Sequence, residues 1–299
     1  MSIDPTNLAV SFIIPSLSVP NEIYTLIEKI IDIKRSEVIV VNQNPKRPIS
    51  RLTCSNIKEI LVDKAISASE ARNLGASIAN GEFLFFLDDD ADLLNVPTNL
   101  VDYIDKNSDK CDVLVFDRCY KIGNILHSYN PSVDRWYKSH WSMAKFVTEW
   151  NTCLRKSVFL KAGMFPGIGT GSASKAQSGE MFVLFSSIYN ITDRISYLPI
   201  VKVIHPPYAG EKPLEKCLGY YYGAGYSVGL SLINFSSMFK AIWILRSFSA
   251  AIRDLLIPIS SLLKPSDCRA NLLYKCRISS ARIFGLIDGL RTPKYKVTT

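Results

Sequence analysis

The chain of 299 residues has few cysteines, and they follow no pattern. Its seven cysteines, at positions 54, 111, 119, 153, 217, 268 and 276, include no C-x-x-C pair. An odd, scattered set argues against a disulfide framework or a zinc site and is typical of reduced thiols in the cytosol. The first residues, Met1–Leu8, lack a basic stretch followed by an apolar one, so we expect no secretory signal.

The composition is not that of a disordered chain, and no nucleic-acid-binding motif accompanies its basic residues. Hydrophobic residues make up 47% and charged residues 21% of the sequence, which indicates a globular protein. The length is enough for one large domain or for a domain with an appendage. Although the net charge is +8, we expect no nucleic-acid partner because such a motif is lacking.

Four carboxylates lie within five residues, at Asp88, Asp89, Asp90 and Asp92. They follow the apolar run Phe83–Leu87, which predicts a strand buried on both faces. Carboxylates gathered at a strand end repel one another and lose hydration, and a divalent cation would remove that cost. Asp oxygens are ligands that Mg²⁺ and Mn²⁺ prefer. The alternative is a solvated acidic turn that caps a following helix.

Strand-like and helix-like segments alternate over most of the chain. Strands are expected at 10–15, 37–41, 57–62, 82–87, 112–117 and 197–204, and helices at 21–33, 67–79 and 180–189. This alternation predicts a mostly parallel sheet, in which ligands bind beyond the carboxyl ends of the strands. Pro15, Asn42 and the Asp88 cluster all lie at such ends.

The excess positive charge is confined to the end of the chain, because residues 240–299 carry eleven Lys or Arg and three Asp. The segment 240–263 is typical of an amphipathic basic helix, interrupted by Pro258, and a second apolar and basic segment spans 272–290. The segment 217–239 has no charged residue, but its Gly, Ser and Tyr content favours a packed or surface-lying helix over a bilayer span. We expect residues 240–299 to contact an anionic membrane surface. The alternative is a helix packed on the preceding domain.

Three motifs in sequence order resemble the family 2 glycosyltransferases, inverting enzymes of the GT-A fold that use nucleotide-sugars. Val10–Pro15 is similar to the opening strand of the family, Ser69–Gly75 to its ARN-x-G helix, and Gly81–Asp90 to its G-x-aromatic-apolar-D-x-D strand and turn. The resemblance covers residues 9–207. It implies an α/β, Rossmann-like GT-A catalytic domain with a mostly parallel sheet over residues 1–210. A helical, amphipathic basic extension would follow over 211–299.

The resemblance also implies a site for the donor and a metal ion. Asp88, Asp90 and His205 would hold Mn²⁺ or Mg²⁺, which neutralises a diphosphate leaving group. The donor would contact Pro15, Asn42, Arg72, Asn73, Asp88 and Asp89. Asn42 stands where the family usually has Asp, which leaves the base open, with uridine favoured. Arg72 could instead pair with an acid such as Glu70 or Asp63.

Inversion requires a base that deprotonates the acceptor hydroxyl, and by the family pattern that base is Glu180. The family has an acidic E-D pair near this position, whereas Met181 follows Glu180 here. Glu180 could alternatively only cap its helix, and Asp193 is a poorer substitute. Aromatic residues could form an acceptor platform or plain core, with equal weight; they are Trp136, Tyr137, Trp141 and Trp150.

The expected function is therefore a metal-dependent inverting glycosyltransferase of the hexosyl type. It would move a sugar from a nucleotide-diphosphate donor, UDP-sugar favoured, to a lipid-linked or cell-envelope glycan such as O-antigen or capsule. It would work in the cytoplasm, peripheral on the inner face of a bacterial membrane. One alternative, kept open by Met181, is a non-catalytic nucleotide-sugar-binding or assembly protein. The other is a nucleotidyltransferase, which normally has a Gly-rich basic loop where Ser16–Pro20 stands.

Overall fold

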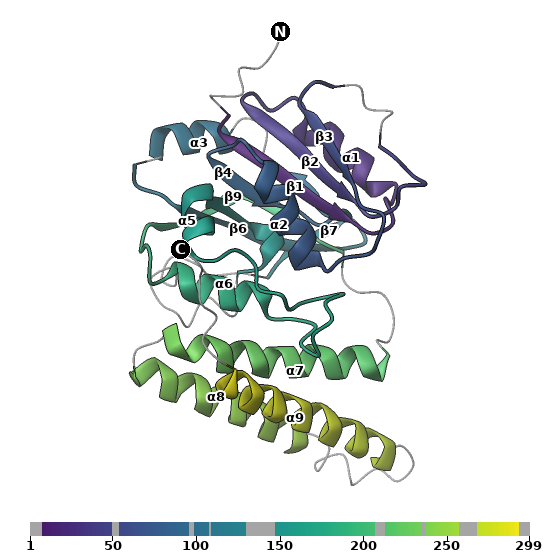
Figure 1. Ribbon diagram of the computed structural model, residues 1–299, viewed down its shortest axis with the longest axis vertical. Coiled ribbons are helices and arrows are strands. Elements are labelled where there is room, and N and C mark those ends of the chain that lie inside the picture. The colour runs from purple at the N-terminus through teal and green to yellow at the C-terminus, as the bar shows by residue number, and fades with distance from the viewer. Residues whose placement is uncertain are drawn as a thin grey trace. The chain divides into compact units, whose positions relative to one another are not determined.

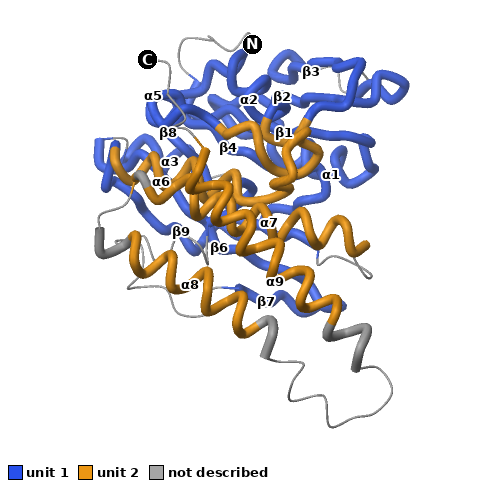
Figure 2. The backbone as a smooth tube through the Cα atoms, turned by 60° about the horizontal axis from the view of Figure 1, so that its bottom comes forward, with its two compact units in different colours: residues 1–66, 70–164, 191–209 blue, residues 67–69, 165–190, 210–299 orange. Residues whose placement is uncertain are grey.

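The computed structural model describes residues 8–49, 54–95, 99–107, 109–129, 147–206, 213–234, 237–256 and 268–292. The chain divides into two compact units, coloured separately in Figure 2. The first comprises Met1–Ile66, Glu70–Met164 and Ile191–Ala209, and the second Ser67–Ser69, Phe165–Asn190 and Gly210–Thr299. The second unit thus includes Phe165–Asn190, which lies before the predicted domain boundary at residue 210.

The first unit is built on a mixed sheet, which has nine strands within the described residues (Figure 1). The strand order is β3-β2-β1-β4-β8-β6-β9-β5, and β7 pairs with β6. Strands β3, β2, β1 and β4 are parallel to one another, whereas β8 runs antiparallel to β4 and β6. The bounds are β1 Val10–Ser16, β2 Ser36–Asn42, β3 Ile57–Leu61, β4 Phe83–Phe86, β5 Asp92–Leu94, β6 Val113–Ile122, β7 Ile125–Ser128, β8 Thr152–Arg155 and β9 Ile195–Ile204.

The central predicted strands β1, β2 and β4 form because their side chains are buried on both faces of the sheet. All four residues of β4 are buried, and Phe85 lies with its ring centroid 5.6 Å from Phe12 on β1 and 4.8 Å from Phe116 on β6. The helices of this unit are α1 Glu22–Ile30, α2 Ala68–Ile78, which begins in the second unit, α3 Asn99–Asn107 and α5 Lys156–Lys161. The predicted α/β fold class is confirmed.

The central parallel strands end at one edge of the sheet, and this places the predicted site residues. Pro15 and Ser16 on β1 pair with Val41 and Asn42 on β2. The backbone N–H of Leu87, just past β4, donates to the carbonyl of Ile13 at 2.9 Å. The chain segments that follow β1, β2 and β4 therefore emerge side by side, as expected for a ligand site at strand carboxyl ends.

The described part of the second unit consists of helices and the loop that precedes the first of them. It contains α6 Glu180–Ile188, α7 Leu214–Ser231, a 3₁₀ turn at Leu232–Asn234, α8 Ser237–Leu256 and α9 Cys268–Arg291. The segment 217–239 is predicted to be a packed or surface-lying helix; α7 packs on α9 as that prediction requires, but it ends at Ser231. Asn234 in the 3₁₀ turn donates from its amide to the hydroxyl of Ser186 at 3.0 Å. In the described part of the chain, no helix has both the length and the apolar content that a bilayer span requires.

Glycines bring α7 and α9 into direct backbone contact (Figure 1). A Cβ added to Gly225 on α7 would collide with the carbonyl oxygen of Arg282 on α9, and one added to Gly289 on α9 would collide with the carbonyl of Tyr226 on α7. Helices pack this closely only where small residues line the contact. Because the contact uses backbone and small residues, larger apolar side chains of these helices are left on other faces.

Helix α8 packs through a face that combines one large aromatic side chain with two small side chains. Trp243, Ser247 and Ala251 are buried, and the hydroxyl of Ser279 on α9 donates to the carbonyl of Ala251 at 3.1 Å. The apolar arc faces solvent instead: the exposed fractions are 65% for Leu245, 40% for Phe248 and 52% for Ile252. The second unit therefore presents an apolar row on its surface.

Candidate functional site

The acidic cluster lies in the tight turn between β4 and β5. The turn is closed by the N–H of Ala91, which donates to the carbonyl of Asp88 at 3.1 Å. Strand β5 then pairs antiparallel with β9, with Asp92 opposite Ile204. This register brings His205, the residue after β9, next to the turn. The strand pairing thus joins residues that are more than a hundred positions apart in the sequence.

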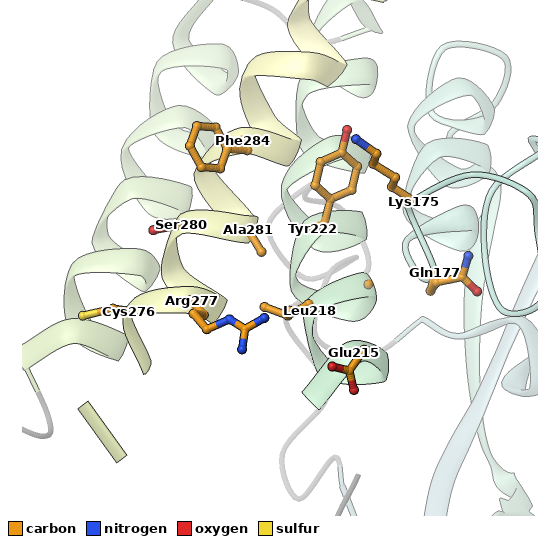
Figure 3. A pocket seen from close by; sticks show the side chains of 11 residues that line it. Lys175, Gln177, Glu215, Leu218, Tyr222, Cys276, Arg277, Ser280, Ala281 and Phe284 are labelled. Carbon is orange, nitrogen blue, oxygen red and sulfur yellow. The ribbon is translucent and has the colours of Figure 1, made fainter. Parts of the chain in front are cut away.

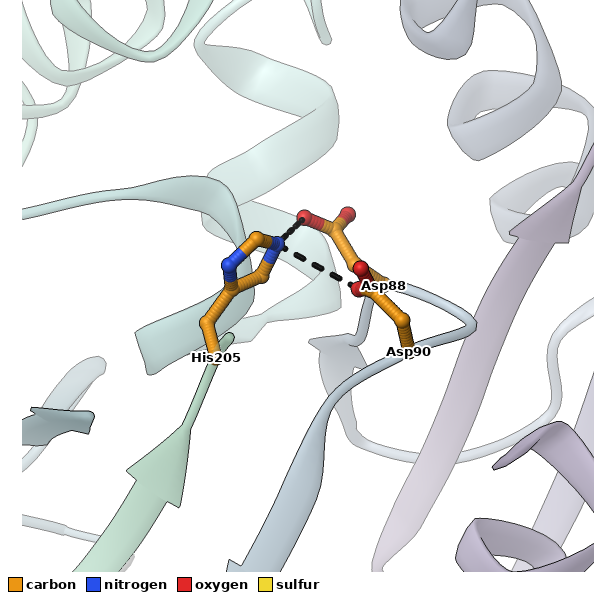
Figure 4. Close-up of side chains that lie close together, drawn as sticks. All are labelled: Asp88, Asp90 and His205. Atoms are coloured by element: carbon orange, nitrogen blue, oxygen red, sulfur yellow. Dashed lines mark ion pairs between the residues drawn. The ribbon is translucent and has the colours of Figure 1, made fainter. Parts of the chain in front are cut away.

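Asp88, Asp90 and His205 converge with their ligand atoms within 4.8 Å of one another (Figure 4). The Nε2 atom of His205 lies 3.5 Å from Oδ2 of Asp88 and 3.3 Å from Oδ1 of Asp90. Two carboxylate oxygens and an imidazole nitrogen form a ligand set that suits a divalent cation such as Mn²⁺. Among the described residues, these three side chains form the one group of acidic, His or Cys side chains close enough together to hold a metal ion.

The orientation of the His205 ring fits the same role. Its Nδ1 lies 2.8 Å from the carbonyl oxygen of Pro206, which can accept the Nδ1 proton. A backbone acceptor at one ring nitrogen fixes the tautomer and leaves the other nitrogen as a ligand. The ring also stacks on Trp150, with centroids 5.1 Å apart and planes 25° apart. The side chain is therefore held on both its edge and its face.

The carboxylate of Asp88 is half-buried between two cationic partners. Its Oδ1 accepts a hydrogen bond from Nη2 of Arg72 at 2.8 Å, and Oδ2 faces His205. Burial acts to raise the pKa of Asp88, but the hydrogen bond and charge of His205 and the charge of Arg72 outweigh it and lower that pKa. Burial would lower the pKa of His205, but Asp88 and then Asp90 raise it to about 9. The two carboxylates therefore favour the protonated, cationic form of the imidazole.

The other two aspartates have different surroundings. The hydroxyl of Ser16 donates to Oδ2 of Asp89 at 2.5 Å, but burial first, and then the charges of Asp90 and Asp88, raise the pKa of Asp89 to about 6. Asp92 turns away from the cluster and pairs with Lys29 and Lys121. Four carboxylates within five residues thus have three kinds of partner: two face His205, one accepts from Ser16 and one pairs with lysines.

Arg72 has a partner that the sequence did not suggest. It pairs with Asp88 and, at 3.7 Å, with Glu149. Glu149 begins the 3₁₀ turn Glu149–Asn151, which is fixed by a reciprocal hydrogen-bond pair between Thr148 and Asn151. The only sequence signal for Glu149 is the Thr-x-x-Asn cap, which says nothing about a site.

The remaining predicted residues occupy varied positions. Trp150 lies against His205, whereas Trp136 and Trp141 lie outside the described residues. Pro15 and Asn73 are half-buried, on β1 and α2. Asn42 has no exposed area, and its amide bonds the carbonyl of Arg47 at 3.0 Å and Glu59 at 2.7 Å. This geometry favours a structural role for Asn42 over contact with a base.

Glu180 belongs to the second unit, at the N-terminus of α6. It is 5% exposed, and its carboxylate fits against Gly169, where an added Cβ would lie 2.7 Å from the carboxyl carbon. Gly169 has a φ of +103°, so both its backbone conformation and the nearby carboxylate require glycine there. Met181 is also buried and cannot replace a second carboxylate.

The raised pKa of Asp89 predicts that this side chain destabilises the protein at neutral pH. The folded state binds its proton more tightly than the unfolded state, so its stabilising contribution is complete below pH 3.8 and is lost as the pH rises through about 6. Asp89→Asn should therefore raise the melting temperature at pH 7.5 in the presence of a metal chelator, and this increase should become smaller towards pH 4. Thermal melts between pH 4 and pH 7.5 measure the increase, and Asp102→Asn, at an exposed position of α3, is the control. A gain that does not change with pH would contradict this.

Comparison with solved structures gives the same fold. The crystal structure of S. aureus TarS 1-349 in complex with UDP-GlcNAc matches with a TM-score of 0.57 and 16% identity, covering 95% of this chain and 90% of that one. The crystal structure of S. aureus TarS 1-349 matches with a TM-score of 0.57 and 17% identity, covering 95% of this chain and 89% of that one. A further crystal structure of S. aureus TarS matches with a TM-score of 0.57 and 16% identity, covering 95% of this chain and 54% of that one. No curated protein matches the chain by sequence.

The family comparison is more specific. The model described as "Glycosyl transferase family 2" matches residues 11–166, which is more than half of the chain and includes β1, the Arg72 helix and the acidic turn. Among the three classes that the sequence left open, this match selects the sugar-transferring enzymes. The chain belongs to glycosyl transferase family 2 and is a glycosyltransferase.

Proposed function

We propose that this enzyme transfers a sugar, with inversion, from a nucleotide-diphosphate donor to a hydroxyl group, with the help of a divalent cation. The observation that supports this most is the convergence of Asp88, Asp90 and His205. Arg72 and His205 offset the charge of Asp88, and Asp90 faces the same imidazole. A divalent cation at this point would neutralise both carboxylates together.

The chain itself supplies the ligands and the groups that hold them. Asp88, Asp90 and His205 would hold Mn²⁺ or Mg²⁺, which would act as a Lewis acid that neutralises the departing diphosphate. Arg72 fixes one oxygen of Asp88, and Trp150 holds the imidazole plane. Pro15, Asn73 and Asp89 remain the candidate donor contacts around the same edge of the sheet.

The donor that we favour is a UDP-sugar. The structural likeness to TarS in complexes with UDP-GlcNAc and with UDP agrees with this choice, although at 16% identity it shows the fold alone. Because Asn42 is fully engaged, recognition of the base would fall to its neighbours, such as Gln43 at the end of β2. The side-chain oxygen of Gln43 accepts from the N–H of Ile66 at 2.7 Å, which fixes that residue in place.

Glu180 is the proposed base that takes the proton of the acceptor hydroxyl. A buried carboxylate at a helix N-terminus is fixed in position, and general-base catalysis requires such positioning. The acceptor that we propose is a lipid-linked or cell-envelope glycan, with the aromatic residues Trp136, Trp141 and Trp150 as candidate contacts. The protein would then work at the cytoplasmic face of a bacterial membrane.

Membrane contact is supported by the solvent-facing apolar row of α8, Leu245, Phe248 and Ile252. Apolar residues spaced by three and four positions on a helix in a basic segment are typical of helices that lie in a membrane interface. Each nearby Lys or Arg adds about 1 kcal/mol of attraction to anionic lipid. The tail would thereby hold the enzyme where a lipid-linked acceptor is found.

Asp90→Asn tests the metal site. The substitution removes one charged ligand oxygen, so the affinity for Mn²⁺ in the presence of UDP should fall at least about tenfold. Calorimetric titration measures this, and UDP release from the donor should be lost in parallel. The matched control is Asp92→Asn, because Asp92 pairs with Lys29 and Lys121 outside the cluster. Unchanged Mn²⁺ affinity in Asp90→Asn would contradict the proposed ligand role.

Glu180→Gln tests the base. The amide keeps the shape of the side chain but cannot accept the proton, so transfer should fall by about 10²–10⁴-fold while donor affinity stays within about threefold. Rates of UDP formation and donor titrations separate the two effects. Asp193→Asn, at the poorer candidate, serves as the control and should leave the rate unchanged. An unaffected rate in Glu180→Gln would remove this residue as the base.

Replacing the apolar row of α8 tests membrane contact. Deleting residues 240–299 would also remove the packing of α9 on α7, so Leu245→Ser, Phe248→Ser and Ile252→Ser together are the sharper change. Each side chain that leaves the interface loses about 1.5–3 kcal/mol, so cosedimentation with phosphatidylglycerol vesicles should be abolished. Ile122→Ser with Ile125→Ser, at exposed positions of the β6–β7 hairpin, is the control. Cosedimentation equal to that of the wild type would overturn the contact.

A further inference from the structure

A groove of about 640 Å³ lies within the second unit, between α7, α9 and the loop that precedes α6 (Figure 3). The proposed transfer reaction does not use it. Its lining residues are Lys175, Gln177, Glu215, Leu218, Gly219, Tyr222, Cys276, Arg277, Ser280, Ala281 and Phe284. The volume falls in the range of sites that hold small molecules. Phe284 is 61% exposed, so its ring is accessible to a molecule in the groove.

The walls of the groove are fixed in place. The amide of Gln177 donates to the carbonyls of Ser172 and Ser174 at 3.0 and 2.6 Å, and its oxygen accepts from the N–H of Gly171 at 3.0 Å. The loop contacts α7 directly at Gly219, whose carbonyl accepts from the N–H of Gln177 at 3.1 Å. On the other side, the hydroxyl of Tyr222 donates to Asp288 at 2.7 Å, which fixes its ring. The cavity is therefore preformed.

The charged side chains that line the groove are mainly basic. Within the described part of the chain, neither Lys175 nor Arg277 forms an ion pair, and Glu215 is the one acid among the lining residues. Figure 3 shows Arg277 and Glu215 towards one end and Phe284 and Lys175 towards the other. Apolar side chains lie between them. This combination suits a molecule with an apolar chain and a negatively charged group.

We propose that the groove binds one anionic amphiphile, an alkyl or isoprenyl chain that ends in a phosphate. The chain would lie against Leu218, Ala281 and Phe284, and Arg277 would contact the phosphate. A guanidinium group suits this because it can donate two parallel hydrogen bonds to phosphate oxygens. Each methylene buried contributes about 0.8 kcal/mol, so the chain supplies affinity and the charge supplies selectivity. The site does not depend on the sugar-transfer reaction.

Cysteines of the chain itself provide the test. Cys276 lines the groove and Cys54 is exposed elsewhere, and both are free thiols. Dodecyl phosphate, used below its micelle concentration, should slow maleimide labelling of Cys276 about tenfold and leave labelling of Cys54 unchanged, as followed by peptide mass spectrometry. Inorganic phosphate and dodecyl maltoside at the same concentration should protect neither, because one lacks the chain and the other the charge.

Substitution at the groove separates a specific site from general detergent binding. Arg277→Gln should require about tenfold more dodecyl phosphate for the same protection. Arg253→Gln, an exposed arginine of α8 that does not line the groove, should behave as the wild type, and circular dichroism should show both variants folded. Equal protection of Cys54 and Cys276, protection by dodecyl maltoside or by phosphate alone, or no effect of Arg277→Gln would each overturn the proposal.

Discussion

The candidate site depends on how one half-buried carboxylate, that of Asp88, is neutralised. Arg72 bonds one of its oxygens and His205 faces the other. A buried charge without such partners would cost several kcal/mol, so the elements that carry them must be held in register. Helix α2 carries Arg72, the pairing of β5 with β9 delivers His205, and the turn after β4 carries Asp88 itself. The same arrangement that satisfies the carboxylate without metal leaves Asp90 and the ring nitrogen of His205 directed at one point.

The sequence predicts the parts of this site that are local. The apolar runs of β1, β2 and β4 are buried strands, and the Asp88 turn follows β4 as expected. The partners of those residues could not be predicted, because they depend on pairings across the fold. Glu149 approaches Arg72 from a 3₁₀ turn, and Asp92 leaves the acidic group for two lysines. Asn42 illustrates the same limit, since only the structure shows its amide engaged by Glu59 and Arg47.

The second unit shows how close helix packing exposes apolar surface. The glycines of α7 and α9 place backbone against backbone, so that contact buries few large side chains. Leu245, Phe248 and Ile252 on α8 and Phe284 on α9 remain exposed. The spacing of apolar residues predicts that α8 is amphipathic, but it does not predict which face packs against α9. Ser247 and Ala251 are small enough to be buried there, and the larger apolar residues are left exposed. Exposed apolar residues together with the basic side chains that line the groove are consistent with lipid as a common partner of this unit.

The central claim is that Asp88, Asp90 and His205 together bind a divalent cation. The most direct measurement is anomalous diffraction from crystals grown with Mn²⁺ and UDP. The account predicts one anomalous peak within coordination distance of three atoms: Oδ2 of Asp88, a carboxylate oxygen of Asp90 and Nε2 of His205. Arg72 should still donate its hydrogen bond to Asp88. A manganese peak that does not touch these three side chains, or His205 still paired with Asp88 in crystals saturated with Mn²⁺, would contradict it.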